Sequence, residues 1–155
     1  MDLTKSQKLL YTIIEKLGGI DDKIKLAKFQ YFSDFIHYAF FNNPISDMTS
    51  IYEKRSYGPL SRNFNSDLTV LSSKGLIQQS GKYEYAIKKE VETELSKEEI
   101  KTVEYVLSKY SNYTYDILAD ITHKQIPYLS ATEGGVVEYD TAYNLIDEYS
   151  DYQTA

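Results

Sequence analysis

The sequence predicts a mainly α-helical protein, a compact bundle of about six helices around a central apolar helix at 23–41. A small β-hairpin near 76–88 completes the expected fold. Apolar residues recur at helical spacing in several segments, and residues 23–41 are apolar over most of their circumference. Residues 78–88 instead alternate apolar and polar side chains around a Ser80-Gly81 turn, the pattern of a hairpin. We expect one domain over 1–155.

The N-terminal part of the chain is expected to hold two helices. Residues 5–17 show an amphipathic pattern, and Gly18-Gly19 ends it because glycine readily adopts the left-handed conformation at helix ends. Either Asp21 or Asp22 can cap the helix at 23–41. Because that helix is apolar on most sides, we expect it in the middle of the domain.

The middle of the chain has the order of elements found at the end of a winged helix. A short strand is expected at 49–55, and Tyr57-Gly58-Pro59 forms a stiff turn because proline fixes its own φ. A helix at about 60–74 follows, which Gly75 ends before the hairpin. This order fits DNA-binding winged helices and also relatives of that module that do not bind DNA.

The C-terminal part is predicted to be helical as well. Ser96-Lys97-Glu98-Glu99 is a capping box for a helix at 97–110. A further helix is expected from Thr114 to about Lys124, and a last one from Asp140. The final residues, 150–155, are expected to be frayed.

The net charge of −6 is unevenly distributed. Residues 1–77 contain ten basic and eight acidic residues, whereas residues 78–155 contain seven and fifteen. An acidic surface repels phosphates and attracts basic partners. The carboxylates of Asp147, Glu148 and Asp151 are therefore candidates for partner binding, although a solvated face that keeps the protein soluble is the better interpretation of the acidic half.

No catalytic residues and no metal ligands are predicted. The chain has no Cys, no apolar run long enough to cross a membrane and no signal-peptide pattern, so we expect a cytoplasmic protein. His37 lies one turn after Asp34, but a structural histidine is the better interpretation, as it is for His123 near a helix end. Phosphate-binding glycine loops and metal-ligand spacings are missing, so no cofactor is expected.

DNA binding is an open alternative. The helix at 60–74 has side chains near its start that can contact base edges, and the hairpin contributes lysines. These residues are Arg62, Asn63, Asn65, Ser66, Lys82, Lys88 and Lys89. Against this, Asp67 lies on the same helix and the whole chain is acidic, whereas DNA-binding proteins gather basic residues on one face.

Three segments together resemble the SocA-like, or Panacea, antitoxin domain. The segment from Lys25 to Phe32 resembles that family's KLQKLLYFA-type helix, and Tyr57-Gly58-Pro59 its YGP turn. Thr122-His123 followed by Ile126-Pro127-Tyr128 is similar to its THxxxPW element. The family-motif residues, for which a structural role is expected, are Lys25, Leu26, Lys28, Phe29, Tyr31, Phe32, Gly58, Pro59, Thr122, His123 and Pro127.

The resemblance covers about residues 5–149 and includes three departures. The hairpin expected at 78–88 is longer than in typical members. Phe29-Gln30 replaces a common Leu-Leu pair, and Tyr128 replaces a usual Trp. The resemblance implies a non-enzymatic protein that binds and neutralises a small toxin encoded nearby, or delivers it to a protease. Tyr57 and Arg62 are further candidates for contact with that partner.

Two other functions compete with the antitoxin hypothesis. One is a winged-helix-like transcriptional regulator, which needs a basic stripe around the 60–74 helix and the hairpin. The other is an accessory protein of a phage or mobile element that binds a host protein. The sequence does not indicate the oligomeric state.

Overall fold

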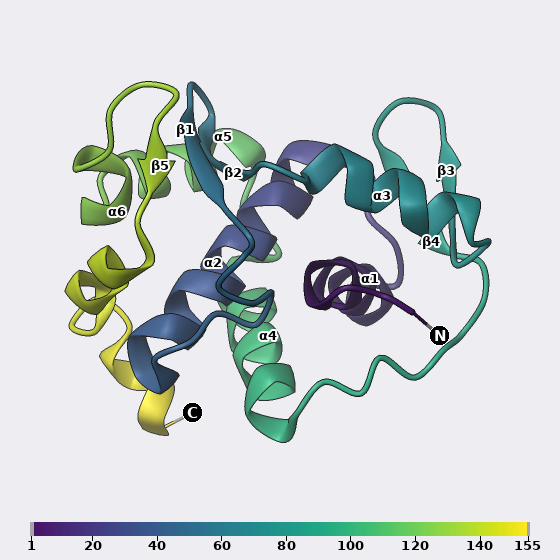
Figure 1. Cartoon of the computed structure of the whole chain (residues 1–155), viewed down its shortest axis with the longest axis horizontal. Coiled ribbons are helices and arrows are strands. Elements are labelled where there is room, and N and C mark those ends of the chain that lie inside the picture. Colours follow the sequence, from purple (N-terminus) through teal and green to yellow (C-terminus); the bar gives the residue numbers. More distant parts are fainter. Residues whose placement is uncertain (1, 155) are drawn as a thin grey trace.

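The computed structural model describes residues 2–154 and is mainly helical, as predicted (Figure 1). In chain order its elements are α1 (Lys5–Leu17), α2 (Lys23–Phe41), β1 (Tyr52–Arg55), β2 (Gly58–Ser61), α3 (Phe64–Ser73), β3 (Ile77–Ser80), β4 (Glu84–Ile87), α4 (Lys97–Tyr110), α5 (Tyr115–His123), α6 (Ile126–Leu129), β5 (Val136–Val137) and the 3₁₀ helices η1 (Tyr139–Leu145) and η2 (Ser150–Thr154).

Helix α2 lies at the centre, as its apolar sequence predicts. Its ends follow from local chemistry, because the Asp22 carboxylate accepts hydrogen bonds from the Ile24 and Lys25 amides and Asn42 ends the helix with a φ of 64°. Phe29, Phe32 and Phe35 are all fully buried. The prediction of a central helix at 23–41 is confirmed.

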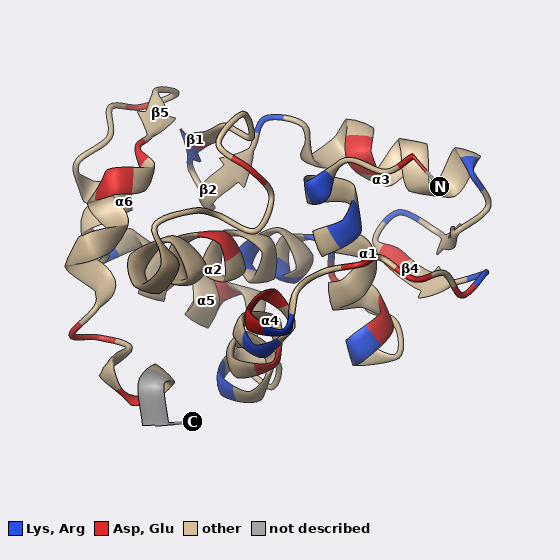
Figure 2. Cartoon of the chain, turned by 60° about the horizontal axis from the view of Figure 1, so that its bottom comes forward, with Lys and Arg blue, Asp and Glu red and all other residues tan. Residues whose placement is uncertain are grey.

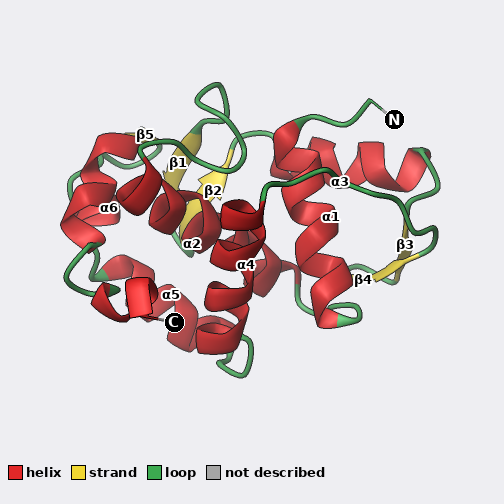
Figure 3. Ribbon diagram, turned by 90° about the horizontal axis from the view of Figure 1, so that it is seen from below, coloured by secondary structure: helices red, strands yellow, loops and turns green. Residues whose placement is uncertain are grey.

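The other elements pack on different sides of α2 (Figure 1). Helices α1 and α3 and the β3–β4 hairpin lie on one side, while the antiparallel sheet β2-β1-β5, α5, α6 and η1 lie on the other. Helix α4 packs along α2 and also touches α1, so it connects the two sides. The view from below shows the same division, with the hairpin far from the three-stranded sheet (Figure 3).

The predicted helix at 60–74 is correct only in its second part. Residues Gly58–Ser61 instead form β2, which pairs with β1 in the register Tyr52↔Ser61 and Arg55↔Gly58. Pro59 is compatible with this strand because β2 is at the edge of the sheet, where a missing N–H does not interrupt a ladder. Helix α3 therefore begins only at Phe64.

Helix α3 contains no Lys or Arg and one acidic residue, Asp67 (Figure 2). The buried carboxylate of Asp67 accepts hydrogen bonds from Ser6 Oγ at 2.7 Å and Gln7 Nε2 at 3.2 Å, both on α1. The β3–β4 hairpin forms as predicted, with Ile77 opposite Ile87. The turn–helix–hairpin order is thus real, but α3 itself has no basic stripe.

The C-terminal segment differs from the prediction in two ways. The last helix is a 3₁₀ helix, η1, and the chain continues into η2 instead of fraying after residue 150. Tyr152 explains the second difference, because its ring is buried and stacks on Phe40 with 5.0 Å between centroids. Its hydroxyl lies 2.7 Å from Thr102 Oγ1 on α4. An aromatic anchor thus fixes the segment against α2 and α4.

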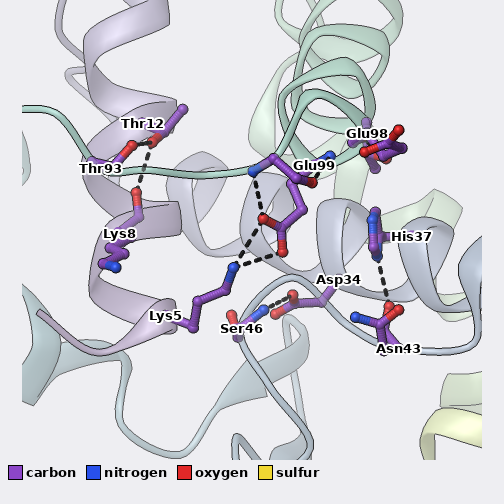
Figure 4. A network of polar contacts seen from close by, with 12 residues as sticks. Lys5, Lys8, Thr12, Asp34, His37, Asn43, Ser46, Thr93, Glu98 and Glu99 are labelled. Carbon is purple, nitrogen blue, oxygen red and sulfur yellow. Dashed lines mark hydrogen bonds and ion pairs between the residues drawn. The ribbon is translucent and has the colours of Figure 1, made fainter.

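A buried polar network fixes the loop between α2 and β1 (Figure 4). The Asp34 carboxylate accepts hydrogen bonds from the Ser46 amide at 2.7 Å and the Tyr52 hydroxyl at 2.6 Å. His37 makes no pair with Asp34, since its Nδ1 lies 2.6 Å from the Asn43 carbonyl oxygen. Burial raises the pKa of Asp34 to about 6, although its hydrogen bonds oppose this shift.

Truncation of Phe32 to alanine should lower the free energy of unfolding by about 3–5 kcal/mol, because it leaves a cavity beside Tyr110, whose ring stacks on Phe32 at 4.5 Å. Urea denaturation measures the loss, and the same loss is expected for Phe29→Ala. Phe41→Ala is the matched control, since Phe41 is 38% exposed at the end of the same helix and should lose far less. A loss below about 1 kcal/mol at Phe32 would contradict the central position of α2.

Gly58→Val should destabilise the protein by about 3 kcal/mol or more, through strain and overpacking together. Gly58 has a φ of +124°, and a Cβ there would lie 2.7 Å from Thr122 Oγ1 and 2.8 Å from Lys28 Cε. Gly81→Val separates the two effects, because Gly81 has a φ of +66° with no atom within 4 Å of such a Cβ. Equal losses in the two variants, measured by thermal denaturation, would show that the close approach around Gly58 is unimportant.

Asp34 should make the protein less stable as the pH rises from about 4 to 6. Its folded-state pKa of about 6 lies above the ordinary 3.8, so the folded protein holds this proton more tightly than the unfolded chain does. The resulting penalty of about 3 kcal/mol is absent below pH 4 and complete above pH 6. We expect the difference in unfolding free energy between the wild type and Asp34→Asn to change by this amount across that range. A difference independent of pH would contradict the assignment.

Candidate functional site

The three segments that resemble the antitoxin family meet around the start of β2. Gly58 lies where α2, β2 and α5 approach one another most closely, between Lys28 on α2 and Thr122 on α5. Thr122 is fully buried, and its hydroxyl donates to the Ala119 carbonyl oxygen at 2.8 Å. Because only glycine lacks a Cβ, Gly58 permits this close approach as well as the positive φ.

Tyr128 lies on α6, at the position where the family usually has Trp, and it holds the β1–β2 turn against this helix. The Tyr128 hydroxyl donates a hydrogen bond to the Arg55 carbonyl oxygen at 2.7 Å. Lys54 Nζ lies 4.5 Å from the centroid of the Tyr128 ring and donates to the Ala131 carbonyl oxygen at 3.0 Å. The ring of His123 packs against the ring of Tyr128, with 4.7 Å between the two centroids. The segment from 122 to 128 therefore positions the turn.

Lys28 is the unusual member of this cluster. Only 3% of it is exposed, and no described residue forms a hydrogen bond or an ion pair with its ammonium group. Burial lowers the pKa of Lys28 to about 8, and the Asp22 carboxylate opposes part of the shift. At neutral pH the side chain therefore carries a positive charge that is largely desolvated. Such a group is a candidate for a functional site.

Lys28 lines a surface pocket of about 230 Å³, which we call the Lys28 pocket. Its apolar lining comes mainly from α2, β2 and α3, and consists of Ile24, Ala27, Leu60 and Phe64. Tyr57, Tyr83 and Asn65 lie at its exposed edge. Lys23 and Arg55 add two more cationic side chains, whereas no acidic residue lines the pocket. The pocket is thus apolar and cationic in a protein whose net charge is −6.

The remaining motif residues are mostly interior. Lys25 is half-buried, and its ammonium group donates to the Ser111 carbonyl oxygen at 2.9 Å. The Tyr31 hydroxyl donates to Gln125 Oε1 at 2.8 Å, so α2 is bonded to the segment between α5 and α6. The side chains buried in the interior are Leu26, Phe29, Tyr31, Phe32, Pro59, Thr122 and Pro127.

Tyr57 and Arg62, two of the residues predicted to contact a partner, lie on the same side of the molecule. Tyr57 is 60% exposed and stands at the edge of the Lys28 pocket. Arg62 is half-exposed, and its Nε lies 2.8 Å from Glu53, a carboxylate that also pairs with Arg55. The Arg62 guanidinium is therefore already engaged within the protein.

The acidic candidates lie elsewhere. Asp147, Glu148 and Asp151 belong to the C-terminal segment, which packs near the far end of α2. Glu148 accepts a hydrogen bond from Gln125 Nε2 at 3.0 Å, and Asp151 accepts one from the Tyr105 hydroxyl. The structure thus does not bring the five predicted partner residues together in one site.

From the sequence, Lys28 was predicted only as a motif residue and Asn65 only as a possible DNA contact, whereas Arg55 and Tyr83 were not predicted to belong to a site. The sequence contains one signal for the special position of Lys28. This lysine follows Ile24 by four residues on a helix that is apolar on nearly every side. A lysine at such a position is either covered by a partner group or faces a pocket. The other three residues join the pocket only through tertiary structure.

Two searches of the described residues gave no candidates. No helix in residues 2–154 has the length and apolar character needed to cross a membrane. Within the same part of the chain, no three His, Asp or Glu side chains gather as a metal site.

Comparison with known proteins gave one family match. The model of the family described as "Antitoxin SocA-like, Panacea domain" matches residues 26–127, about two thirds of the chain. This range includes Lys28, Gly58, Thr122 and Pro127. Neither the curated proteins nor the solved structures gave a match. Of the residues that line the Lys28 pocket, Lys23 and Ile24 lie outside this range and the others within it. Because the match covers more than half of the described sequence, the chain belongs to the family of the SocA-like antitoxin, Panacea domain.

Proposed function

We propose that this protein neutralises a small toxin encoded nearby by binding it directly, in the cytoplasm and without catalysis. One observation carries the proposal: most of the residues around the Lys28 pocket lie in the range matched by an antitoxin family, and its buried lysine forms no hydrogen bond or ion pair within the described chain. A buried charge without a partner is costly, and a bound protein can supply the missing partner.

The surface around the pocket has the composition of a protein interface. Tyr57, Tyr83 and Tyr115 are 60%, 54% and 44% exposed, and they line the Lys28 pocket or the hollow next to it. Tyrosine is enriched at the centres of interfaces because it combines a large apolar ring with a polar tip. We propose Tyr57 and Tyr83 as anchors for the toxin, with Arg62 at the margin.

The acidic C-terminal segment has a separate proposed role. Asp147, Glu148 and Asp151 are exposed, and their field would speed the encounter with a basic toxin without lying in the main contact. The winged-helix alternative has no comparable support, because the ten residues of α3 include no Lys or Arg.

Co-expression with the neighbouring gene product tests the proposal. That product should stop growth when expressed alone, and this protein should restore growth and co-purify with it as a stable complex. Tyr57→Ala combined with Tyr83→Ala should weaken the complex about tenfold or more, because buried aromatic anchors dominate interface energies. Calorimetry with the purified proteins measures the change.

Tyr143→Ala is the matched control, since Tyr143 is 44% exposed but contacts Tyr38 near the C-terminal end of α2 and Asn42 just after it. It should bind the toxin like the wild type. A neighbouring product that is harmless, or that remains toxic and does not co-purify, would refute direct neutralisation. Rescue with loss of the toxin from the cell, and no stable complex, would instead identify a protease adaptor.

A further inference from the structure

We propose that the Lys28 pocket binds a carboxylate carried by an apolar residue of the partner protein, with the Lys28 ammonium group donating to the carboxylate. This inference rests on the proposed function for the source of the ligand, but the pocket can be tested without the toxin. The carboxylate belongs either to the partner's C-terminus or to an acidic side chain beside an apolar residue.

The charge of the pocket favours an anion. Lys23, Lys28 and Arg55 all contribute to its lining, and no acidic residue does. Arg55 is already paired with Glu53, and Asp22 accepts hydrogen bonds from the α2 amides of Ile24 and Lys25. Neither carboxylate forms a hydrogen bond or an ion pair with Lys28, on which Asp22 acts only through its electric field. The most deeply buried cation of the pocket therefore has no direct partner among the described residues.

The apolar lining and the size favour a residue rather than a free ion or a large metabolite. A volume of about 230 Å³ is below the roughly 300–1,000 Å³ typical of pockets for drug-sized ligands. It provides room for one side chain against Ile24, Leu60 and Phe64, beside the ammonium group. An occupant of this kind removes apolar surface from water while it neutralises the buried charge.

A carboxylate fits the donors better than a phosphate does. Phosphate sites in proteins use several backbone amides at a helix N-terminus or in a glycine-rich loop, or the fork of an arginine. Here the lining offers the point charges of Lys23 and Lys28 among apolar side chains, and one nitrogen of Arg55 is already paired with Glu53. The buried point charge of Lys28 with apolar neighbours is matched by a single carboxylate on an apolar residue.

Small probes test the inference on the whole protein by NMR titration of the backbone amides around Lys28, Gly58 and Leu60. The probes are N-acetyl-leucine, which has an α-carboxylate, and N-acetyl-leucyl-glutamyl amide, whose only carboxylate is on a side chain. N-acetyl-leucinamide, acetate and inorganic phosphate complete the set. We expect saturable shifts with at least one of the first two, and about tenfold or more weaker binding of N-acetyl-leucinamide, because it cannot form the charged hydrogen bond.

Lys28→Met tests the role of the ammonium group. Methionine keeps the shape and removes the buried charge, so the fold should be retained and probe binding should be lost about tenfold or more. Lys25→Met is the matched control, because Lys25 lies three residues away on α2, outside the Lys28 pocket, and donates to Ser111 instead. It should bind N-acetyl-leucine like the wild type.

Preference for N-acetyl-leucine would assign the pocket to a chain terminus, and preference for the glutamyl probe would assign it to an acidic side chain. Both support the inference. Equal binding of N-acetyl-leucinamide, full binding by Lys28→Met or tighter binding of phosphate would overturn it; phosphate would indicate a nucleotide ligand. If Lys28→Met fails to fold, the comparison of carboxylate and amide in the wild type still decides.

The two proposals fail in different ways. A protein that binds N-acetyl-leucine through Lys28 but does not bind the neighbouring gene product loses the toxin function and keeps the carboxylate pocket. If the Lys28→Met variant neutralises the toxin as well as the wild type does, the proposed toxin function stands and the inference about the pocket is wrong.

Discussion

The burial of α2 on all sides is the constraint on which the rest of the structure depends. This helix touches α1, α4, α5, β2 and η1, so a polar group on it has little access to water and needs a partner in the interior. Asp34 is bonded to Ser46 and Tyr52, and Tyr31 to Gln125. Each of these bonds fixes a segment that is distant in sequence: the loop after α2, strand β1, and the connection between α5 and α6. The central helix thus orders its surroundings through hydrogen bonds as well as through apolar contacts.

Lys28 is a buried charged group of α2 for which this pairing is missing among the described residues. Its position follows from the same arrangement, because Gly58 brings the β2 backbone close to Lys28 Cε and Thr122 Oγ1. The desolvated ammonium group is unfavourable for a residue with no other role. Unfavourable local features of this kind are concentrated at functional sites, where binding offsets them. The family motif therefore marks a pocket as well as a folding core.

The sequence predicted those elements whose ends are defined locally. Helices α1, α2 and α4 each begin at a capping residue, Thr4, Asp22 and Ser96, so their bounds could be read from the chain. Strand β2 was missed because Pro59-Leu60-Ser61 does not alternate and becomes a strand only by pairing with β1. The pocket was missed for a similar reason: Lys28, Leu60 and Tyr83 are far apart in sequence, and only packing brings them together. The resemblance named several of these residues but not the surface that they form.

The cationic Lys28 pocket and the acidic C-terminal segment lie near opposite ends of α2, and their charges act over different distances. The helix has 19 residues and is about 28 Å long, whereas charges are screened beyond roughly 8 Å at physiological ionic strength. Under the proposed function, the acidic C-terminal half would influence the approach of the partner, and Lys28 would act only once contact is made. A freely diffusing anion is disfavoured by the net charge of −6, so an anionic group reaches the Lys28 pocket most readily when a basic protein carries it. Under the proposed function, these two ranges acting in sequence would favour a net-basic partner with a carboxylate at the contact point.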